Sequence, residues 1–352
     1  MSVHEKYMKR CLELAAMGLG KVAPNPMVGC VIVHNNKIIG EEYHKEFGSA
    51  HAEVNAISSV KDKSLLNDSI LYLNLEPCSH FGKTPPCADL IIRNKIKYVV
   101  IGTLDSNPLV AGRGIQKLVS SGCDVMLGIM EEECRELNKR FFVFHEKKRP
   151  YIILKWAETA DKYIGITNYE LRITNQRADK LVHQWRSDEQ AIVVGTNTAL
   201  TDNPKLTVRN IKGNNPLRIV IDKDLKIPVR FHLLDGKVST IVFTSKQKSS
   251  KKNLEYIRID FKKNVLKQII DELYNRNIQS LIVEGGAKLL NSFINENIWD
   301  DARVIISNKK LSELSKEKSR VEAPSVKGKL ILEKKSGSDS LKVFRNTSAS
   351  SR

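Results

Sequence analysis

Three side chains in the first quarter of the sequence have the types and spacing of a catalytic zinc site. His51 offers an imidazole nitrogen, and Cys78 and Cys87 offer two sulfurs. Structural zinc usually has four protein ligands, whereas catalytic zinc has three and keeps one position open for water. No fourth ligand stands at regular spacing, so the residues favour a catalytic zinc. A structural zinc knuckle and an inert buried cysteine pair are the alternatives.

Glu53 stands two residues after His51, close enough to hydrogen-bond a metal-bound water without being a ligand itself. The zinc deaminases combine H-x-E with P-C-x-x-C, and their glutamate carries protons. In this chain Cys78 and Cys87 are nine positions apart, so the match is to a variant spacing. The pattern predicts hydrolytic deamination in which Glu53 takes a proton from water and returns it as the amine leaves.

The elements that must hold these residues alternate between strands and helices. Apolar periodicity predicts helices at about 3–19, 51–60, 115–120 and 130–145, with another from Pro86. Apolar runs predict strands at 28–33, 38–40, 70–75, 98–102 and 123–127. His51 and Cys87 would then stand at helix starts, where the helix dipole favours thiolate. The alternation predicts a mostly parallel sheet covered on both faces.

A charged run that ends in proline, 146–150, predicts a domain boundary. We expect a first domain at 1–147 and a second at 148–335. Residues 336–352 would form the end of the second domain, and the serine-rich tail from 346 would be disordered. Strands are predicted at 151–157, 191–195, 217–221, 238–244, 281–283 and 302–306, and helices near 178–185, 265–275 and 287–295. The second domain is again α/β. Its Gly285-Gly286 turn would let backbone amides approach a pyrophosphate, although such a turn alone is weak evidence.

Composition narrows the class of protein. The chain has 352 residues with 41% hydrophobic content, six cysteines and a net charge of +17. No apolar run is long enough to span a membrane and no secretory signal is present, and six cysteines make no disulfide framework, so we expect a cytoplasmic protein. The lysines are spread along the chain, which favours a solvated basic surface over a nucleic-acid patch.

Several motifs occur together in one order and resemble one family. They are Pro24-Asn25-Pro26-x-Val28-Gly29, Tyr43-His44, Gly48-x-x-His51-Ala52-Glu53, Pro77 to Cys87, Asp105-x-Asn107-Pro108, Leu154-Lys155-x-Ala157, Val194-Gly195-x-x-Thr198, Asp202-Asn203-Pro204-x-Leu206-Thr207-x-Arg209 and Glu284-Gly285-Gly286-Ala287. Nearly the whole chain resembles the bifunctional riboflavin biosynthesis proteins, in which a pyrimidine deaminase is fused to a reductase.

This resemblance implies an α/β protein with an N-terminal cytidine-deaminase-like three-layer αβα domain and a C-terminal dihydrofolate-reductase-like domain. It implies zinc and NADPH as cofactors and a phosphorylated diaminopyrimidine as substrate. The first domain would deaminate 2,5-diamino-6-(5-phosphoribosylamino)pyrimidin-4(3H)-one to 5-amino-6-(5-phosphoribosylamino)uracil. The second would reduce the ribosyl group to a ribityl chain.

The resemblance also implies the residues of both sites. In the deaminase domain the substrate would be lined by Asn25, His44, Ser79, His80, Lys83 and Asn107. In the reductase domain NADPH would contact Ala157, Thr198, Asp202, Gly286, Ala287 and Lys288, and the substrate would contact Arg186, Leu206, Arg209 and Glu284. Arginine suits the phosphate because its planar fork pairs bidentately. Taken singly, Asn25, His44 and Lys83 have ordinary explanations as a turn residue, a strand-end histidine and a solvated lysine.

The chain departs from the family pattern in the second domain. Thr159 replaces the usual serine, Lys162 the usual glycine, and Glu170 and Arg172 stand where serine and tryptophan are common. A lysine-rich run at 309–320 replaces a glycine-rich loop. We therefore expect retained NADPH binding and a working reductase with an altered substrate pocket, in which Arg172 could offset the charge of Glu170.

Two other classes of function compete with this interpretation. A nucleic-acid base deaminase fits the charge but not the Pro77–Cys87 spacing or the second domain. A zinc-stabilised binding module leaves Glu53 without a purpose. We expect a small-molecule substrate and no nucleic-acid or membrane partner. The sequence leaves open a homo-oligomer, the domain orientation, transfer of the intermediate and the face of hydride transfer.

Overall fold

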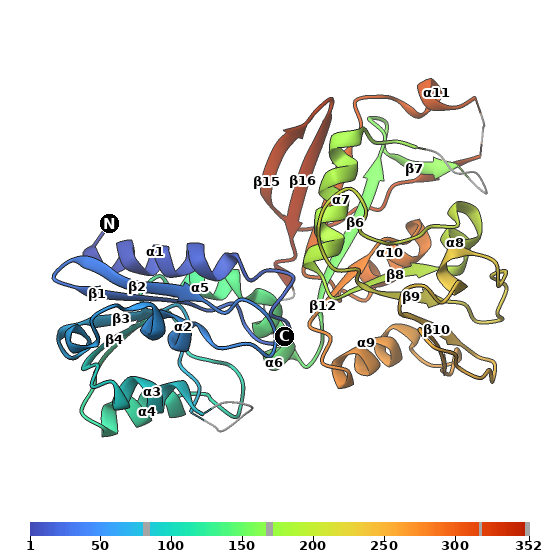
Figure 1. Ribbon diagram of the computed structural model, residues 1–352. Coiled ribbons are helices and arrows are strands. Elements are labelled where there is room, and N and C mark those ends of the chain that lie inside the picture. Colours follow the sequence, from blue (N-terminus) through green and yellow to red (C-terminus); the bar gives the residue numbers. More distant parts are fainter. Residues whose placement is uncertain (80–84, 167–171, 317–318, 349–352) are drawn as a thin grey trace. The chain divides into compact units, whose positions relative to one another are not determined.

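The computed structural model describes residues 1–79, 85–166, 172–316 and 319–348. The chain divides into two compact units, Met1–Lys148 and a second unit that begins at Arg149 (Figure 1). This division lies one residue from the boundary expected from the charged run. Each unit has its own sheet and is described by itself.

The first unit contains a five-stranded mixed sheet. Its strands, in order across the sheet, are β2 (Lys37–Tyr43), β1 (Gly29–His34), β3 (Ile70–Leu73), β4 (Tyr98–Ile101) and β5 (Asp124–Leu127). β3, β4 and β5 are parallel, but β1 is antiparallel to both β2 and β3. β2, β3, β4 and β5 therefore run in one direction and β1 alone runs against them. The sheet is thus mostly parallel in strand direction, as expected, with the β1–β2 hairpin at one edge.

Helices cover both faces of this sheet, as expected. Along β1, Cys30 and Ile32 pack against α2 (Ala52–Ser59), α3 (Cys87–Arg93) and α4 (Arg113–Ser120). The alternate residues Val31 and Val33 pack instead with α1 (Val3–Ala16) and α5 (Glu131–Leu137). Since successive strand residues point to opposite faces, one apolar run fills two cores. Figure 1 shows α1 and α5 on one side of the sheet and α2, α3 and α4 on the other. A short 3-10 helix, Lys63–Asp68, precedes β3.

The helix expected at 130–145 is two helices, α5 and α6 (Lys139–Lys147). Asn138 separates them and is buried. Its side-chain oxygen accepts from the Met27 N–H at 2.8 Å, and its amide nitrogen donates to the Met27 carbonyl at 2.9 Å. This tie to a distant segment is a tertiary contact, and helical periodicity does not predict it.

The second unit contains a nine-stranded sheet. Its strands, in order across the sheet, are β11 (Leu254–Arg258), β10 (Thr240–Thr244), β9 (Leu217–Ile221), β8 (Ala191–Gly195), β12 (Ser280–Val283), β6 (Tyr151–Glu158), β13 (Asp301–Ile306), β16 (Asp339–Arg345) and β15 (Lys329–Ser336). The strands from β11 to β13 are parallel, and β16 and β15 continue the sheet antiparallel. A separate pair joins β7 (Tyr163–Ile166) to β14 (Arg320–Glu322).

Helices lie on both faces of this sheet too. One core joins Ile152, Leu154 and Val283 to α9 (Val265–Asn275) and α10 (Ala287–Asn295), both at the predicted bounds. On β13, Ala302 and Val304 belong to this core, whereas the Arg303 guanidinium lies 5.1 Å from the ring of Trp185 on α7 (Gln176–Asp188). α7 therefore packs on the opposite face. The shorter helices are α8 (Thr196–Asp202), α11 (Leu311–Leu314) and a 3-10 turn at His232–Leu234.

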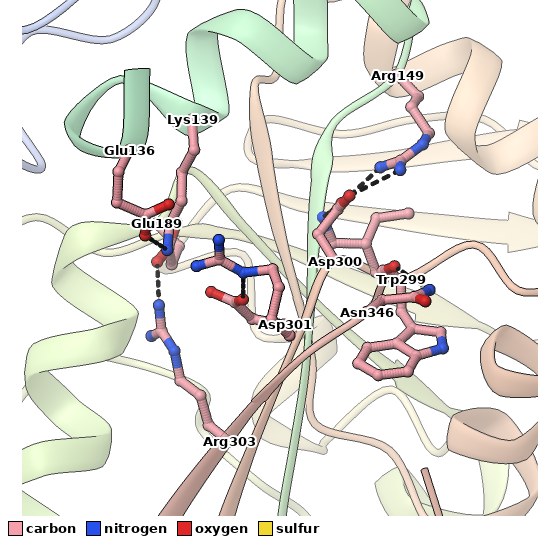
Figure 2. Close-up of polar contacts among 11 residues, drawn as sticks. Glu136, Lys139, Arg149, Glu189, Trp299, Asp300, Asp301, Arg303 and Asn346 are labelled. Carbon is pink, nitrogen blue, oxygen red and sulfur yellow. Dashed lines mark hydrogen bonds and ion pairs between the residues drawn. The ribbon is translucent and has the colours of Figure 1, made fainter. Parts of the chain in front are cut away.

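Buried polar pairs join distant segments beside β13. Figure 2 shows the Arg149 guanidinium bound to both oxygens of Asp300, at 2.6 and 2.8 Å. It also shows Arg303 facing Glu189, at 3.1 Å. Asn346, where we expected the tail to become disordered, is buried and donates to the Trp299 carbonyl at 2.8 Å. The ordered chain thus extends past β16.

Candidate active sites

The predicted zinc ligands meet at the ends of three elements. His51 is the N-cap of α2, Cys78 follows β3, and Cys87 is the first residue of α3, as the sequence predicted. His51 Nδ1 lies 3.7 Å from Cys78 Sγ and 3.4 Å from Cys87 Sγ. In the described parts of the chain, this is the one group of three or more histidine, cysteine or acidic side chains able to share an ion.

The donor set fits zinc. Zinc–sulfur bonds of about 2.3 Å and zinc–nitrogen bonds of about 2.0 Å at tetrahedral angles place nitrogen and sulfur about 3.5 Å apart. The separations of 3.4 and 3.7 Å match this spacing. One of the two thiols, that of Cys78, is also biased toward the thiolate form that binds metal. A hydrogen bond from the Cys87 thiol, together with the nearby His51, lowers the pKa of Cys78 to about 4, whereas that contact and burial raise the pKa of Cys87.

Glu53 lies in the first turn of α2, and its side chain is buried. Burial and the neighbouring Cys78 raise the pKa of its carboxyl group. One helical turn therefore carries both a ligand and an acid beside the ligand sulfurs. The spacing of two residues in H-x-E is what places both at the start of one helix.

Two residues expected to bind the pyrimidine lie beside the metal ligands. His44 is buried, and its ring is 5.3 Å from that of His51 in an edge-on arrangement. One ring nitrogen of His44 is 3.1 Å from the side-chain nitrogen of Asn25, and the other is 3.1 Å from the Ala50 carbonyl. Burial, followed by the proximity of His51, lowers the pKa of His44. A neutral His44 can thus orient the Asn25 amide.

Of the remaining residues expected in the deaminase site, the structure describes Ser79 and Asn107 but not His80 and Lys83. Ser79 directly follows the ligand Cys78 and is half-buried. Asn107 lies in the connection between β4 and α4, and its N–H donates to Asp105 Oδ1 at 2.7 Å. Burial, with a smaller contribution from the Glu76 carboxylate, raises the pKa of Asp105 to about 7.

The second unit has a cavity of about 410 Å³ at the carboxyl ends of its parallel strands. Of the predicted cofactor residues, Thr198, Gly286 and Lys288 line it; Ala157, Asp202 and Ala287 do not. Sequence reasoning missed other lining residues: Thr196, Asn197, Ile221, Lys223, Phe261, Val265, Leu266, Leu289, Ser292 and Glu296. Lys223 follows strand β9, and a cation at a strand's carboxyl end was the signal available in the sequence.

The Gly285-Gly286 turn is suited to a nucleotide. Gly286 is the N-cap of the nine-residue helix α10, and its N–H donates to Thr198 Oγ1 at 2.9 Å. A Cβ added to Gly285 would lie 2.8 Å from Leu289, so only glycine lets the turn pack this closely. Apolar walls, a helix N-terminus and two lysines together fit a dinucleotide phosphate cofactor such as NADPH.

Predicted substrate residues of the reductase form a buried ion network. Arg186 on α7 binds Glu284 through Nε–Oε1 at 3.0 Å and Nη2–Oε2 at 2.7 Å. Lys155 Nζ lies 3.7 Å from the same carboxylate. Although burial alone would raise the pKa of Glu284, the two cations lower it to about 2. Burial, opposed by Glu284, lowers the pKa of Lys155.

The loop after α8 carries the other two predicted substrate residues. Leu206 is buried with φ of 52°, a left-handed conformation that is strained for a bulky residue. Arg209 is exposed, and its Nη1 donates to Thr207 Oγ1 at 3.2 Å. Arg186 reaches the same segment, with Nη1 3.4 Å from the Thr207 carbonyl. The two arginines thus approach one loop, but only Arg186 is held by a carboxylate there.

The structure explains one departure from the family pattern. Lys162 has φ of 62°, a conformation that glycine adopts without cost, which accounts for the glycine usual at this position. Its N–H closes the turn by donating to the Thr159 carbonyl at 2.9 Å. Leu311, which belongs to the lysine-rich run at 309–320, is buried, and its N–H donates to Asp161 Oδ1 at 2.9 Å. This run therefore packs on the turn.

Arg172 pairs with Asp179 on α7. Glu170, the partner that the sequence suggested, lies outside the described residues. The first turn of α7 thus receives the positive charge that this departure introduces.

Fold and sites together define a zinc-dependent deaminase domain fused to a reductase domain. The cytidine and deoxycytidylate deaminase zinc-binding region matches residues 1–103, and the RibD C-terminal domain matches residues 150–320. The chain belongs to the RibD family of riboflavin biosynthesis proteins. This confirms the predicted fold class, the two enzyme activities, and zinc and NADPH as the cofactors of the two domains.

The similarity extends over almost the whole chain. RibD from Aquifex aeolicus is 41% identical over 317 residues, which cover 88% of each chain. A solved diaminohydroxyphosphoribosylaminopyrimidine deaminase/5-amino-6-(5-phosphoribosylamino)uracil reductase from Thermotoga maritima has a TM-score of 0.88 and 36% identity, covering 98% of this chain and 99% of that one. RibD from Acinetobacter baumannii, with 28% identity and the same coverage, also has a TM-score of 0.88.

Proposed function

We propose that the first unit converts 2,5-diamino-6-(5-phosphoribosylamino)pyrimidin-4(3H)-one to 5-amino-6-(5-phosphoribosylamino)uracil. The second unit then reduces the ribosyl group of that product to a ribityl chain with NADPH. The observation that carries the proposal is the triangle of His51, Cys78 and Cys87 with Glu53 buried beside it. The activity of the Thermotoga maritima relative supports the choice of substrate.

In the deaminase unit His51, Cys78 and Cys87 would hold the zinc. Bound zinc supplies a Lewis acid that makes water a nucleophile near neutral pH. Glu53 accepts the proton that water loses as its oxygen bonds to the ring carbon bearing the amine. It then donates a proton to the departing nitrogen, so ammonia leaves and the carbon keeps the oxygen.

The surrounding residues orient the pyrimidine. His44 is too buried to carry charge readily, and the Asn25 side chain is held against it. An amide fixed in this way can offer both a donor and an acceptor to a pyrimidine edge. Asn107, whose N–H is held by Asp105 in the β4–α4 connection, would also contact the substrate.

In the reductase unit the cavity at the carboxyl ends of β8 and β9 would hold NADPH, which supplies a hydride. The N–H groups at the start of α10 would face its phosphates, with Lys223 and Lys288 adding positive charge. Arg186 is already committed to Glu284, so it positions that carboxylate. Among the residues that the structure describes, no carboxylate pairs with Arg209, which would take the substrate phosphate.

A paired assay tests both activities in one preparation. Ammonia release from the diaminopyrimidine reports on the first unit, and NADPH oxidation with supplied 5-amino-6-(5-phosphoribosylamino)uracil reports on the second. We expect both in the wild-type chain. Deamination of cytidine or of adenosine in RNA, without turnover of the phosphorylated diaminopyrimidine, would overturn the proposed substrate.

We also propose that the protein works in the cytoplasm without a nucleic-acid or membrane partner. All six cysteines are free thiols, which suits a reducing compartment. No helix in the described residues is both long enough and apolar enough to cross a lipid bilayer. A gel shift at physiological salt that shows submicromolar, sequence-selective RNA binding would contradict the absence of a nucleic-acid partner.

A further inference from the structure

One buried carboxylate beside the metal ligands has no part in the proposed chemistry. Glu76 stands two residues before Cys78, and only 3% of the residue is exposed. Its own N–H donates to the Thr103 carbonyl at 3.0 Å. Its backbone thus lies where the ends of β3 and β4 meet.

The Glu76 side chain accepts four backbone hydrogen bonds from one segment. Its Oε1 accepts from the N–H groups of Gly114 at 2.8 Å and Ile115 at 3.2 Å. Its Oε2 accepts from Gly112 at 2.9 Å and Asp105 at 3.2 Å. Three of these donors are at the start of α4, where helical N–H groups lack intrahelical partners. A carboxylate is favoured at this positive helix end.

The backbone of the segment is shaped to let the carboxylate in. A Cβ on Gly114 would lie 2.1 Å from the Pro77 carbonyl oxygen, so no larger residue fits there without movement. Gly112, the N-cap of α4, has φ of 83°, a conformation that glycine favours. The 105–115 segment therefore packs directly on the strand end that carries Cys78.

This segment also carries Asn107. The Asn107 N–H is bound to Asp105, and its carbonyl accepts from Val110 at 2.8 Å and Ala111 at 3.1 Å. Asn107 is thus part of a closed turn whose two ends, Asp105 and Gly112, both bond to Glu76. Moving the Glu76 contacts would move Asn107 relative to the zinc ligands.

We propose that Glu76 is a positioning residue of the deaminase, which sets the place of Asn107 relative to Cys78. The inference rests on the proposed deaminase function and adds to it a residue that acts through the 105–115 segment. Glu76 itself would not touch the reacting atoms. Its loss should therefore weaken substrate binding more than the chemical step.

Glu76→Gln is the direct test, because glutamine keeps the size of the side chain. Each Glu76 oxygen accepts two N–H groups, so whichever way the amide turns, its NH₂ faces two donors. We expect KM for the diaminopyrimidine to rise about tenfold or more, with kcat within about threefold and zinc still bound one per chain. Reductase activity of the same molecules is the internal control and should not change.

Hydrogen–deuterium exchange separates positioning from a general loss of stability. In Glu76→Gln, peptides within 105–115 should exchange faster while peptides from β3 keep their protection. Asn107→Ala supplies a double-mutant cycle: if Glu76 acts through Asn107, the double variant should have the KM of Asn107→Ala alone. An unchanged KM in Glu76→Gln, or fully additive effects of the two changes, would overturn the proposal.

Glu76→Asp keeps the charge but shortens the reach, and it carries the same measurements if Glu76→Gln does not fold. Gly114→Ala disturbs the contact from the other side and should raise KM in the same way. Absence of deamination in the wild-type chain would instead overturn the proposed function, and the exchange experiment would still decide whether Glu76 holds the segment.

Discussion

Arg186 and Glu284 form a two-point ion pair across the reductase site, although they stand 98 positions apart in the sequence. Each was expected to face the substrate, and in the structure each faces the other. Lys155 joins them as a third member. The substrate would therefore meet an organised network in which the carboxylate is already oriented.

This pairing predicts how the stability of the second unit depends on pH. The pKa of Glu284 is about 2 in the folded chain and about 4.5 when unfolded, so its contribution is fully present above about pH 4.5. It is lost as the pH falls toward 2 and is worth at most about 3 kcal/mol. Trp156, Trp185 and Trp299 are the only tryptophans and all belong to this unit, so urea unfolding followed by their fluorescence measures it. In Glu284→Gln the free energy of unfolding should fall less steeply between about pH 4.5 and 2 than in the wild type. An equally steep fall would mean that the Arg186–Glu284 pair does not cause this pH dependence.

One zinc should bind per chain, and Cys87→Ala should lose it. The reason is that two remaining ligands cannot complete the donor set at His51 and Cys78. Metal analysis of dialysed protein measures the ratio. Cys123→Ala, which removes a half-buried thiol outside the site, should keep full zinc. Full zinc in Cys87→Ala would mean that the ligand set is wrong.

Glu53→Gln should keep zinc and lose deamination, because an amide cannot accept the proton of the attacking water. Proton transfer of this kind typically contributes about 10²–10⁴-fold. Ammonia release measures the loss, and zinc bound one per chain shows that the first unit is folded. A rate within a few-fold of wild type would remove Glu53 from the mechanism.

Arg209→Ala should weaken the phosphorylated substrate of the reductase by about 10–100-fold and leave NADPH binding within about twofold. A hydrogen bond between charged groups is worth about 1.5–3 kcal/mol, and Arg209 lies outside the NADPH cavity. Calorimetry with each ligand separates the two. An equal loss of affinity for both ligands would mean that Arg209 does not bind the substrate phosphate specifically.

Lys162→Gly should stabilise the second unit by about 1 kcal/mol, because the left-handed conformation at this position costs a lysine more than a glycine. Tryptophan fluorescence during urea unfolding again gives the free energy. Lys162→Ala is the matched control: alanine pays the same conformational cost, so it should bring no gain. Equal stabilisation by both changes would show that the lysine side chain, and not the left-handed backbone conformation, destabilises the wild-type unit.

The sequence by itself predicted the cluster of His51, Cys78 and Cys87, the class of fold and most helices. His51, Glu53 and Cys87 lie at helix starts that local signals predict, and spacing within one helical turn places Glu53 beside the ligand without any long-range information. The bounds of α9 and α10 likewise follow from apolar periodicity, because each helix buries one stripe of side chains.

Only the tertiary structure decided what depends on partners far away in the chain. The pairing of β1 with β3, the break at Asn138 and the Arg186–Glu284 pair each involve segments that meet only after folding. Glu76 is the clearest case, since its four donors stand 29 to 39 positions later. A carboxylate in a sequence indicates charge, but which backbone groups it binds is decided by the strand ends and turns that packing brings to it.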